Sequence, residues 1–564
     1  MSATLTSLLP SSPGFIRKLT LALAILSPTA VLAAPTAITN VKGYTATADS
    51  NWTSFSTLVF DDGKVLATGD KSLLKQFPKA TIIDGKQKTL LPGLIDAHGH
   101  VLGLGFNQLN VDVRGLTSAT ASAQKVKAYS DKHPELNWIR GRGWNQVLWD
   151  KKEFPTAKDL DEYIADKPVW LGRVDGHAGW ANTKALKLAG IDKNTVDPTG
   201  GEIIRDANGN PTGVLIDNAM DLLTEKIPGY SKKETQSALK LAQQHLSSLG
   251  ITSVHDAGIG YNTWNLYQQA AKEKQLNVRL YPMLAATDPA LEKMLKAGHI
   301  KSDDDFLSIR SVKVYADGAL GSRGAALITP YSDKPAHVGL MLASPEHFTQ
   351  LFNTILKYDF QINIHAIGDK ANREALNHFE DGFKLHGGQQ NRHRIEHAQV
   401  VHPDDIPRFK TLNIIPSMQP THATSDMNMA EDRLGKQRLK GAYAWRTFLK
   451  QGSRIAAGSD FPVELANPFH GLHAAITRQN HQNLPKGGWI PAESLSTAEA
   501  LTAFTIDAAW AAHQDDVIGS LEKGKWADFI LIDDDIFSMP TTDIWKITVD
   551  QTWVAGKAVY RADK

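Results

Sequence analysis

The 564-residue chain contains no cysteine. This absence excludes disulfide bonds, thiolate metal ligands and a cysteine nucleophile. Any transition-metal site must therefore use histidine, carboxylate or a less usual ligand, and histidine and carboxylate suit zinc and similar divalent ions.

The chain also lacks a strong charge of either sign. Lys and Arg together number 61, Asp and Glu number 60, and the net charge is +1. Such a balance gives no support to nucleic acid or an anionic membrane surface as a partner. We therefore expect a small-molecule substrate and no nucleic-acid partner, and the sequence leaves the oligomeric state open.

The one long apolar stretch lies near the N-terminus. Arg17 and Lys18 precede apolar residues 19–26, and small residues follow at 30–34. This order is typical of a secretory signal peptide, which we predict at residues 1–33, with an uncleaved anchor as the alternative. No later segment approaches the roughly 18 apolar residues of a membrane span, so none is expected after removal of the signal. We expect export, to a bacterial periplasm or to the medium.

Two segments near the chain ends, residues 34–90 and 511–564, contain short β-type runs and turns, with Asp-Gly turns in the first. We predict that together they form one small β-sandwich domain.

The middle of the chain alternates β-type runs with helical patterns, which is typical of a parallel α/β fold. Eight strands are expected, and their ends fall near His98, Asp256, Met283, Ala316, His365, His397, Met418 and Gly458. Eight such strands predict a (β/α)8 barrel, a TIM-like barrel, over residues 91–104 and 241–510. The interval between the first and second expected strands is too long for one βα unit, so residues 105–240 are predicted to form an inserted substrate or lid domain.

Potential metal ligands gather at the predicted strand ends. His98 and His100 are separated by one glycine at the end of the first strand, where side chains at i and i+2 face the same side. Alone, this pair could equally be an incidental feature of a surface loop. Further candidates lie in or directly after strands 4, 5, 6 and 8, namely Lys313, His365, His397 and Asp460. Because the carboxyl ends of barrel strands share one mouth, the sequence predicts a metal site there.

Six stretches together resemble the amidohydrolase superfamily, and within it the amidohydrolase-3 branch that includes YtcJ-like proteins and N-substituted formamide deformylases. They are LPGLIDAHGH (91–100), RVDGHAGWAN (173–182), VKVYADGALGSR (312–323), IHAIGD (364–369), RIEHA (394–398) and AAGSDFPV (456–463). The resemblance covers nearly the whole mature chain. The combination is specific, whereas any one stretch alone is not.

The resemblance implies a role for each ligand candidate. His98 and His100 would hold one metal with Asp460, and His365 and His397 would hold a second. The expected reaction is cleavage of a C–N bond of the amide type by a metal-bound hydroxide, with Asp460 as the general acid and base. For Asp460 a helix N-cap is the alternative, because Ser-Asp-x-Pro also occurs at helix starts.

Lys313 matches the position where some relatives carry a carboxylated lysine that bridges two metals. Burial lowers the pKa of a lysine, and the neutral amine can then react with CO2. Two zinc ions bridged by carboxylated Lys313 are therefore expected. A single divalent ion beside an unmodified lysine is the alternative.

Four residues are weaker candidates for binding substrate. Asp175 and His177 lie in the family-like stretch of the insert, and Arg323 and His422 lie near the barrel mouth. Each could instead serve as a structural contact. The tryptophan-rich insert could form only its own core, or it could line a pocket for an apolar substrate group.

Other functions stay open on the same fold. They include a mononuclear deaminase and a hydrolase of cyclic amides or esters. A non-catalytic exported protein that binds a metal or ligand would be expected to lack a ligand or the aspartate. All six candidate positions are occupied by suitable residues.

Overall fold

The computed structural model describes residues 34–47 and 51–562. The predicted signal peptide at residues 1–33 lies outside this part of the chain. Among the described residues, no helix has both the length and the apolar character needed to cross a membrane.

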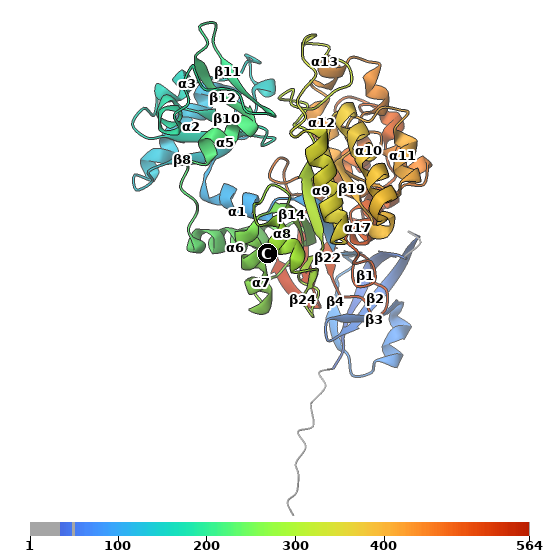
Figure 1. Ribbon diagram of the computed structural model, residues 1–564. Coiled ribbons are helices and arrows are strands. Elements are labelled where there is room, and N and C mark those ends of the chain that lie inside the picture. The colour runs from blue at the N-terminus through green and yellow to red at the C-terminus, as the bar shows by residue number, and fades with distance from the viewer. Residues whose placement is uncertain (1–33, 48–50, 563–564) are drawn as a thin grey trace, which may run out of the picture.

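A parallel barrel forms the centre of the molecule (Figure 1). Its eight strands, in spatial and chain order, are β6 (Leu94–Gly99), β13 (Ile251–Ile259), β14 (Arg279–Ala285), β17 (Ser311–Tyr315), β18 (Gln361–Ala366), β19 (Arg394–His397), β20 (Ile415–Met418) and β21 (Ala456–Ala457). The predicted strand ends agree closely, and the largest difference is at the second strand, which ends at Ile259 rather than near Asp256. The predicted barrel fold is confirmed.

Backbone contacts between the first and last strands nearly close the barrel. The amide of Asp460 donates to the carbonyl oxygen of His98 at 2.6 Å, and the amide of His100 donates to that of Phe461 at 2.7 Å. The closing contacts therefore involve the residues expected to hold the first metal.

Helices pack around the outside of the barrel, and along the chain they alternate with its strands. They are α6 (Lys232–Ser248), α7 (Tyr261–Lys272), α8 (Leu291–Lys296), α9 (Pro345–Lys357), α10 (Asp369–His386), α11 (Ile406–Thr411), α14 (Trp445–Lys450), α16 (Thr497–Ala503) and α17 (Ile506–Ala511). In α9, Ser344 caps the first turn, Pro345 fits the first helical position, and one apolar side is buried. Such an amphipathic helix covers the strands, whose residues are buried on both faces of the sheet.

Strands from both ends of the chain form one connected sheet beside the barrel. They are β1 (Thr36–Ala46), β2 (Trp52–Asp61), β3 (Lys64–Gly69), β4 (Thr81–Asp84), β5 (Thr89–Pro92), β22 (Phe529–Ile532), β23 (Val549–Val554) and β24 (Lys557–Arg561). Strand β5 pairs antiparallel with β22, so residues near the two termini are joined directly.

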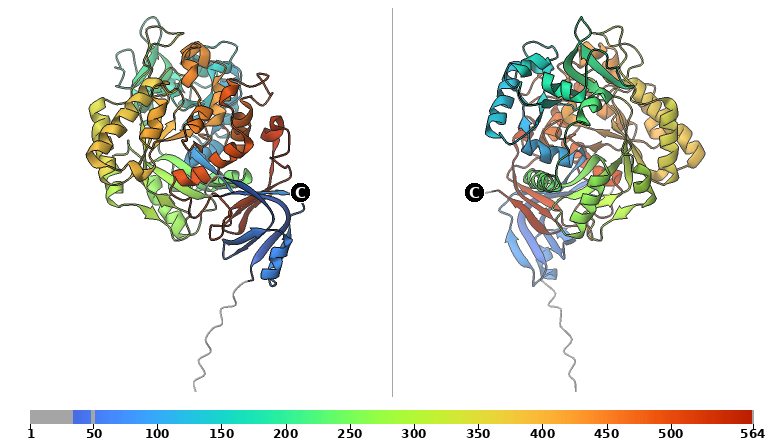
Figure 2. Two further views of the ribbon diagram at one scale, coloured as in Figure 1. Left: turned by 90° about the vertical axis from the view of Figure 1, so that its right-hand side faces the viewer. Right: turned by 60° about the vertical axis from the view of Figure 1, so that its left-hand side comes forward.

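The chain between α1 (Val101–Leu109) and α6 forms a separate six-stranded sheet with its own helices. The strands are β7 (Val111–Asp112), β8 (Ile139–Trp144), β9 (Val169–Arg173), β10 (Ala178–Ala181), β11 (Gly201–Arg205) and β12 (Pro211–Asp217), and the longer helices are α2 (Ala119–Lys132) and α4 (Thr183–Ala189). This insert and the terminal sheet lie at opposite ends of the barrel (Figures 1 and 2). Trp144, Trp149 and Trp180 pack together inside the insert. These three tryptophans therefore belong to the core of the insert, which the sequence offered as the alternative to lining a pocket.

A buried ion pair connects the barrel to the terminal sheet. Arg279 on β14 donates from Nε to Oδ2 of Asp528 at 2.6 Å and from Nη2 to Oδ1 at 3.1 Å. Both side chains are almost fully buried. Loss of one partner would leave an uncompensated buried charge, which costs about 3–5 kcal/mol.

We therefore expect Asp528→Ala to lower the midpoint of thermal unfolding markedly, because the buried charge of the Arg279 guanidinium would lose its partner. Differential scanning calorimetry would measure this. The matched control is Asp131→Ala, which removes an exposed pair with Lys127 and should leave the midpoint nearly unchanged. Equal midpoints for the two variants would contradict the assigned role of the buried pair.

Candidate metal centre

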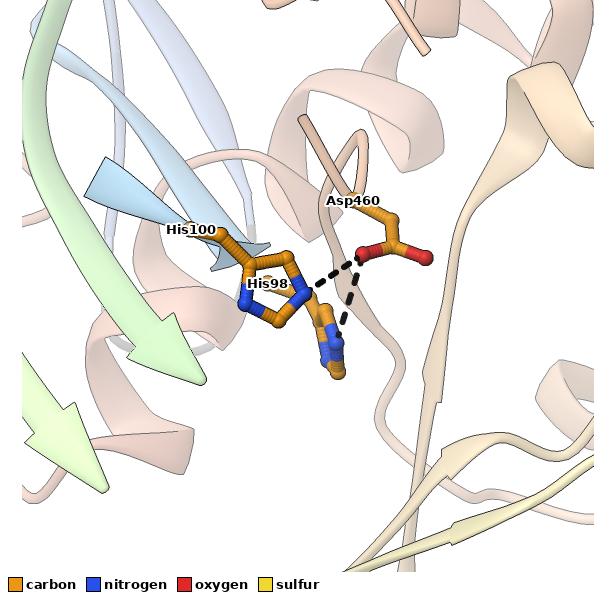
Figure 3. Close-up of side chains that lie close together, drawn as sticks. All are labelled: His98, His100 and Asp460. Atoms are coloured by element: carbon orange, nitrogen blue, oxygen red, sulfur yellow. Dashed lines mark hydrogen bonds and ion pairs between the residues drawn. The ribbon is translucent and has the colours of Figure 1, made fainter. Parts of the chain in front are cut away.

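Three of the predicted ligands meet where the barrel closes (Figure 3). Oδ1 of Asp460 lies 3.1 Å from Nε2 of His100 and 3.7 Å from Nε2 of His98. The ligand atoms of all three residues lie within 4.8 Å of one another. Asp460 caps no helix, because the next one, α15 (Pro468–Thr477), begins later with Asn467 as its cap.

A second group of potential ligands shares Asp460 with the first. Its other members are His397 and His422, and Oδ2 of Asp460 lies 3.7 Å from Nε2 of His422. The sequence named His422 only as a substrate candidate, whereas the structure places it within reach of a metal. Within the described residues, His365 belongs to neither group, but its ring centroid is 4.5 Å from that of His397.

Lys313 lies beside the first of these groups. Its Nζ is 3.1 Å from Nε2 of His98, and only 1% of the residue is exposed. Burial lowers the pKa of Lys313 to about 8. A substantial fraction of the amine is therefore neutral near pH 7 to 8, as carboxylation requires.

A buried carboxylate orients His98 from the side away from Asp460. Glu396 on β19 hydrogen-bonds to Nδ1 of His98 and forms an ion pair with Arg394. Burial alone would raise the pKa of Glu396, but Arg394 and His98 lower it to about 2. The pKa of His98 is lowered to about 4, first by burial and then by the charge of Lys313. A neutral ring that donates from Nδ1 to a carboxylate presents Nε2 as a metal ligand.

Several ring nitrogens at the site have no hydrogen-bond partner. Within the described residues these are Nε2 of His365, Nδ1 of His397 and Nε2 of His422, all of them buried. Two of them have a carboxylate oxygen nearby without a hydrogen bond to it: Oδ1 of Asp317 lies 3.5 Å from Nε2 of His365, and Oδ2 of Asp460 lies 3.7 Å from Nε2 of His422. Buried polar atoms normally have partners, so these nitrogens are suited to a ligand. Burial also holds the pKa values of His365 and His397 well below the usual value, which keeps both rings neutral. Such a donor set of imidazoles and a carboxylate suits divalent zinc or a similar ion.

The backbone adopts an uncommon conformation at two of the ligands. His397 has φ of 72° and Asp460 has φ of 60°, in the left-handed region. Non-glycine residues in this region are uncommon and often lie at functional sites. Both side chains line the cavity at the barrel mouth.

A cavity of about 390 Å³ lies over these groups, between the insert and the barrel loops. From the insert, Asp175 and His177 line it; Asp175 bonds to Arg173 and accepts the backbone amide of His177 at 3.1 Å. Burial would lower the pKa of His177, but Asp217 outweighs it and raises the pKa to about 9. On the barrel side, α12 (Pro420–Asp426) contributes to the wall.

Arg323 is placed elsewhere, and the predicted substrate role for it is not supported. It lies outside the cavity, and its guanidinium bonds to both carboxylate oxygens of Asp333, at 3.2 and 2.9 Å. Asp333 also pairs with Arg433, so these three residues hold the loops beside the mouth together. The charge of Arg323 is satisfied there, which corrects the expectation from sequence.

Two further residues were not named from sequence although they face the site. Tyr315 lines the cavity and follows Lys313 by two positions on β17, so the strand period could have found it. Glu464 also lines the cavity, in the loop after Asp460. Nothing in a loop sequence specifies such a position.

Comparison with known proteins gives long matches. A family model described as "Amidohydrolase family" matches residues 81–560. "Protein LONG AFTER FAR-RED 3" of Arabidopsis thaliana is 35% identical, covering 95% of this chain and 93% of the relative. "Putative amidohydrolase YtcJ" of Bacillus subtilis (strain 168) is 32% identical, covering 89% and 95%. "N-substituted formamide deformylase" of Arthrobacter pascens is 26% identical, covering 91% and 96%.

Two solved structures of metal-dependent hydrolases are also similar to this chain. An uncharacterized metal-dependent hydrolase from Pyrococcus horikoshii OT3 is similar with a TM-score of 0.73 and 28% sequence identity, covering 90% of this chain and 99% of that one. Another from Pyrococcus furiosus has a TM-score of 0.70 and 29% identity, covering 89% and 100%. The chain therefore belongs to the amidohydrolase family and is a metal-dependent hydrolase acting on carbon–nitrogen bonds.

Proposed function

We propose that this hydrolase cleaves an amide-type bond in a small molecule, with Asp460 as general acid and base. The observation that carries the proposal is the convergence of the predicted ligands at one barrel mouth, where several buried imidazole nitrogens form no hydrogen bond. The relative that is named for deformylating N-substituted formamides supports an amide as substrate.

The chain's residues would divide the metal ligation between two positions. His98, His100 and Asp460 would hold one zinc ion, and His365 and His397 would hold the other, with His422 in reach of the second. Carboxylated Lys313 would bridge them. When bound, a divalent ion lowers the pKa of water and polarises a substrate carbonyl group.

Asp460 is suited to move protons. Burial would raise the pKa of Asp460, but the surrounding histidines, His100 first, hold it well below the usual value. The carboxylate is therefore ionised at neutral pH and can accept a proton from the attacking water. It can then pass this proton to the leaving nitrogen.

The chemistry of the buried Lys313 amine supports its bridging role. A neutral lysine amine attacks CO2, an N–C bond forms, and the nitrogen loses a proton to give a carbamate. The lowered pKa of Lys313 favours the neutral amine. The resulting carboxylate-like group would supply oxygen ligands at a place where a protonated lysine would repel a metal.

We expect Asp460→Asn to lower kcat for N-phenylformamide by about 10²–10⁴-fold, because proton transfer is lost. Amine release would be measured with the metal content of each preparation. The matched control is Asp405→Asn, which removes a carboxylate that bonds Arg373 and Arg408 on the outer helices. Full turnover in Asp460→Asn at equal metal content would disprove the assigned role.

Carboxylation of Lys313 predicts a protein mass increased by that of one CO2 under gentle ionisation, together with two metals per chain. Lys313→Ala should lose the added mass and at least one metal. Intact-mass and elemental analysis would measure both. An unmodified wild-type mass, with both metals retained in Lys313→Ala, would favour an unbridged site.

We further propose that the chain is exported to a bacterial periplasm and cleaved after residue 33 or 34. The basic, apolar and small-residue regions before residue 35 support this, as does the absence of cysteine, which makes export independent of disulfide formation. Expression of the full chain in a Gram-negative bacterium should give periplasmic protein with a new N-terminus near Ala34. Cytosolic protein that retains residues 1–33 would contradict export.

A further inference from the structure

One part of the cavity wall contains two carboxylates that form no ion pair. Asp426, the last residue of α12, and Glu464, in the loop after β21, both line the cavity. Within the part of the chain that the structure describes, their partners are uncharged: Gln399 and Tyr443 for Asp426, and Ser425 for Glu464. The cavity therefore has negative groups for which the protein supplies no paired cation.

Hydrogen bonds hold the carboxylate of Asp426 in one orientation. The hydroxyl group of Tyr443 donates to Oδ2 at 2.6 Å, and Nε2 of Gln399 donates to the same oxygen at 2.9 Å. Two donors on one oxygen favour the ionised carboxylate, which only accepts hydrogen bonds. Neither donor bonds to Oδ1, so this oxygen is the acceptor that Asp426 offers to a molecule in the cavity.

The side-chain amide of Gln399 offers a second acceptor. Gln399 is 4% exposed and lines the cavity, and its Nε2 also donates to the hydroxyl oxygen of Tyr443 at 3.0 Å. The reverse orientation of the amide would place Oε1 against the carboxylate of Asp426, and two acceptors repel each other. Oε1 therefore lies on the other side, where it has no hydrogen-bond partner among the described residues. A buried amide oxygen normally has one, which points to a ligand that donates.

The two carboxylates are close enough to affect each other. Burial raises the pKa of Glu464, and the charge of Asp426 adds to this increase, while His422 and Ser425 oppose it. Burial likewise raises the pKa of Asp426. Partly buried negative charges are costly unless a cation compensates them. A protonated amino group carries a positive charge and three N–H donors, so it fits these acceptors, whereas a carboxylate or phosphate group would be repelled.

We propose that Asp426, Glu464 and Gln399 form a subsite for a protonated amino group of the substrate, and that the enzyme prefers amides carrying an ammonium group to neutral amides of the same shape. This inference rests on the proposed amide hydrolysis and names its substrate class. The subsite adjoins the metal centre, because His422 lies near Asp460 and its charge acts on both subsite carboxylates. Binding at the ammonium end would thus place the amide end toward the metal ligands.

The test compares N-(4-aminobutyl)formamide with N-pentylformamide, which has a methyl group in place of the ammonium group. Homologues with two to six methylene groups vary the distance between the formamide and the ammonium group. The value of kcat/KM is measured for metal-loaded wild type, Asp426→Asn and Glu464→Gln. The matched controls are Asp131→Asn and Glu292→Gln, which change exposed carboxylates on helices α2 and α8.

We expect wild type to favour the ammonium substrate about 10–100-fold in kcat/KM at the best chain length, the range of one charge-assisted hydrogen bond. Asp426→Asn and Glu464→Gln should each lower this ratio about tenfold, and the controls should keep it. Glu464→Lys should shift the preference toward N-formyl-4-aminobutanoate, which carries a carboxylate. Elemental analysis should give equal metal content throughout. If Asp426→Asn does not fold, the two Glu464 variants carry the test.

Two results would overturn the inference. One is an equal kcat/KM of wild type for ammonium and neutral amides at every chain length, and the other is a preference that Asp426→Asn and Glu464→Gln both retain. Failure of the proposed function looks different, because wild type would then turn over none of these amides. Calorimetry with butylammonium, which needs no turnover, would still show weaker binding to the two variants than to wild type. Equal binding to all three would overturn the subsite itself.

Discussion

The metal centre depends on a single buried carboxylate. Glu396 joins Arg394, Ser417 and His98, which come from three barrel strands, and it has no exposure to solvent. A buried ionised carboxylate is stable only when its charge is compensated, and the Arg394 guanidinium provides this compensation. Glu396 then fixes Nδ1 of His98 as the donor, which leaves Nε2 directed at Lys313 and Asp460. Glu396 thus determines which nitrogen of His98 can bind a metal.

The contacts that close the barrel are made by the same residues that form the candidate site. The backbone amide of Asp460 bonds the carbonyl oxygen of His98, and that of His100 bonds the carbonyl oxygen of Phe461. These bonds place the side chains of both chain segments at the same mouth, although the segments are separated by some 360 positions. A change that opens the seam between β6 and β21 would therefore separate the ligands as well. Stability and metal binding are coupled here by geometry.

The barrel, and the meeting of most candidate ligands at one mouth, could be predicted because they follow from local periodicity. Alternation along a strand places His98 and His100 together, and the parallel arrangement brings the strand ends to one mouth. Partnership across the fold is not local, so the pairing of Glu396 with His98 and of Arg323 with Asp333 could not be read from the sequence. His422 follows a strand that offered no ligand pattern, and only the structure shows its distance from Asp460.

The insert and the barrel contribute different groups to the cavity. Barrel residues present nitrogens and oxygens suited to a metal. The insert contributes a wall that includes Arg173, Asp175 and His177, held by bonds within the insert itself. Because Asp217 also packs against the barrel loop at Gly318 and Gly324, a shift of the insert would move His177 relative to His365. The position of the insert wall and that of His177 therefore depend on the same contact surface, where Gly318 and Gly324 leave room for the Asp217 carboxylate.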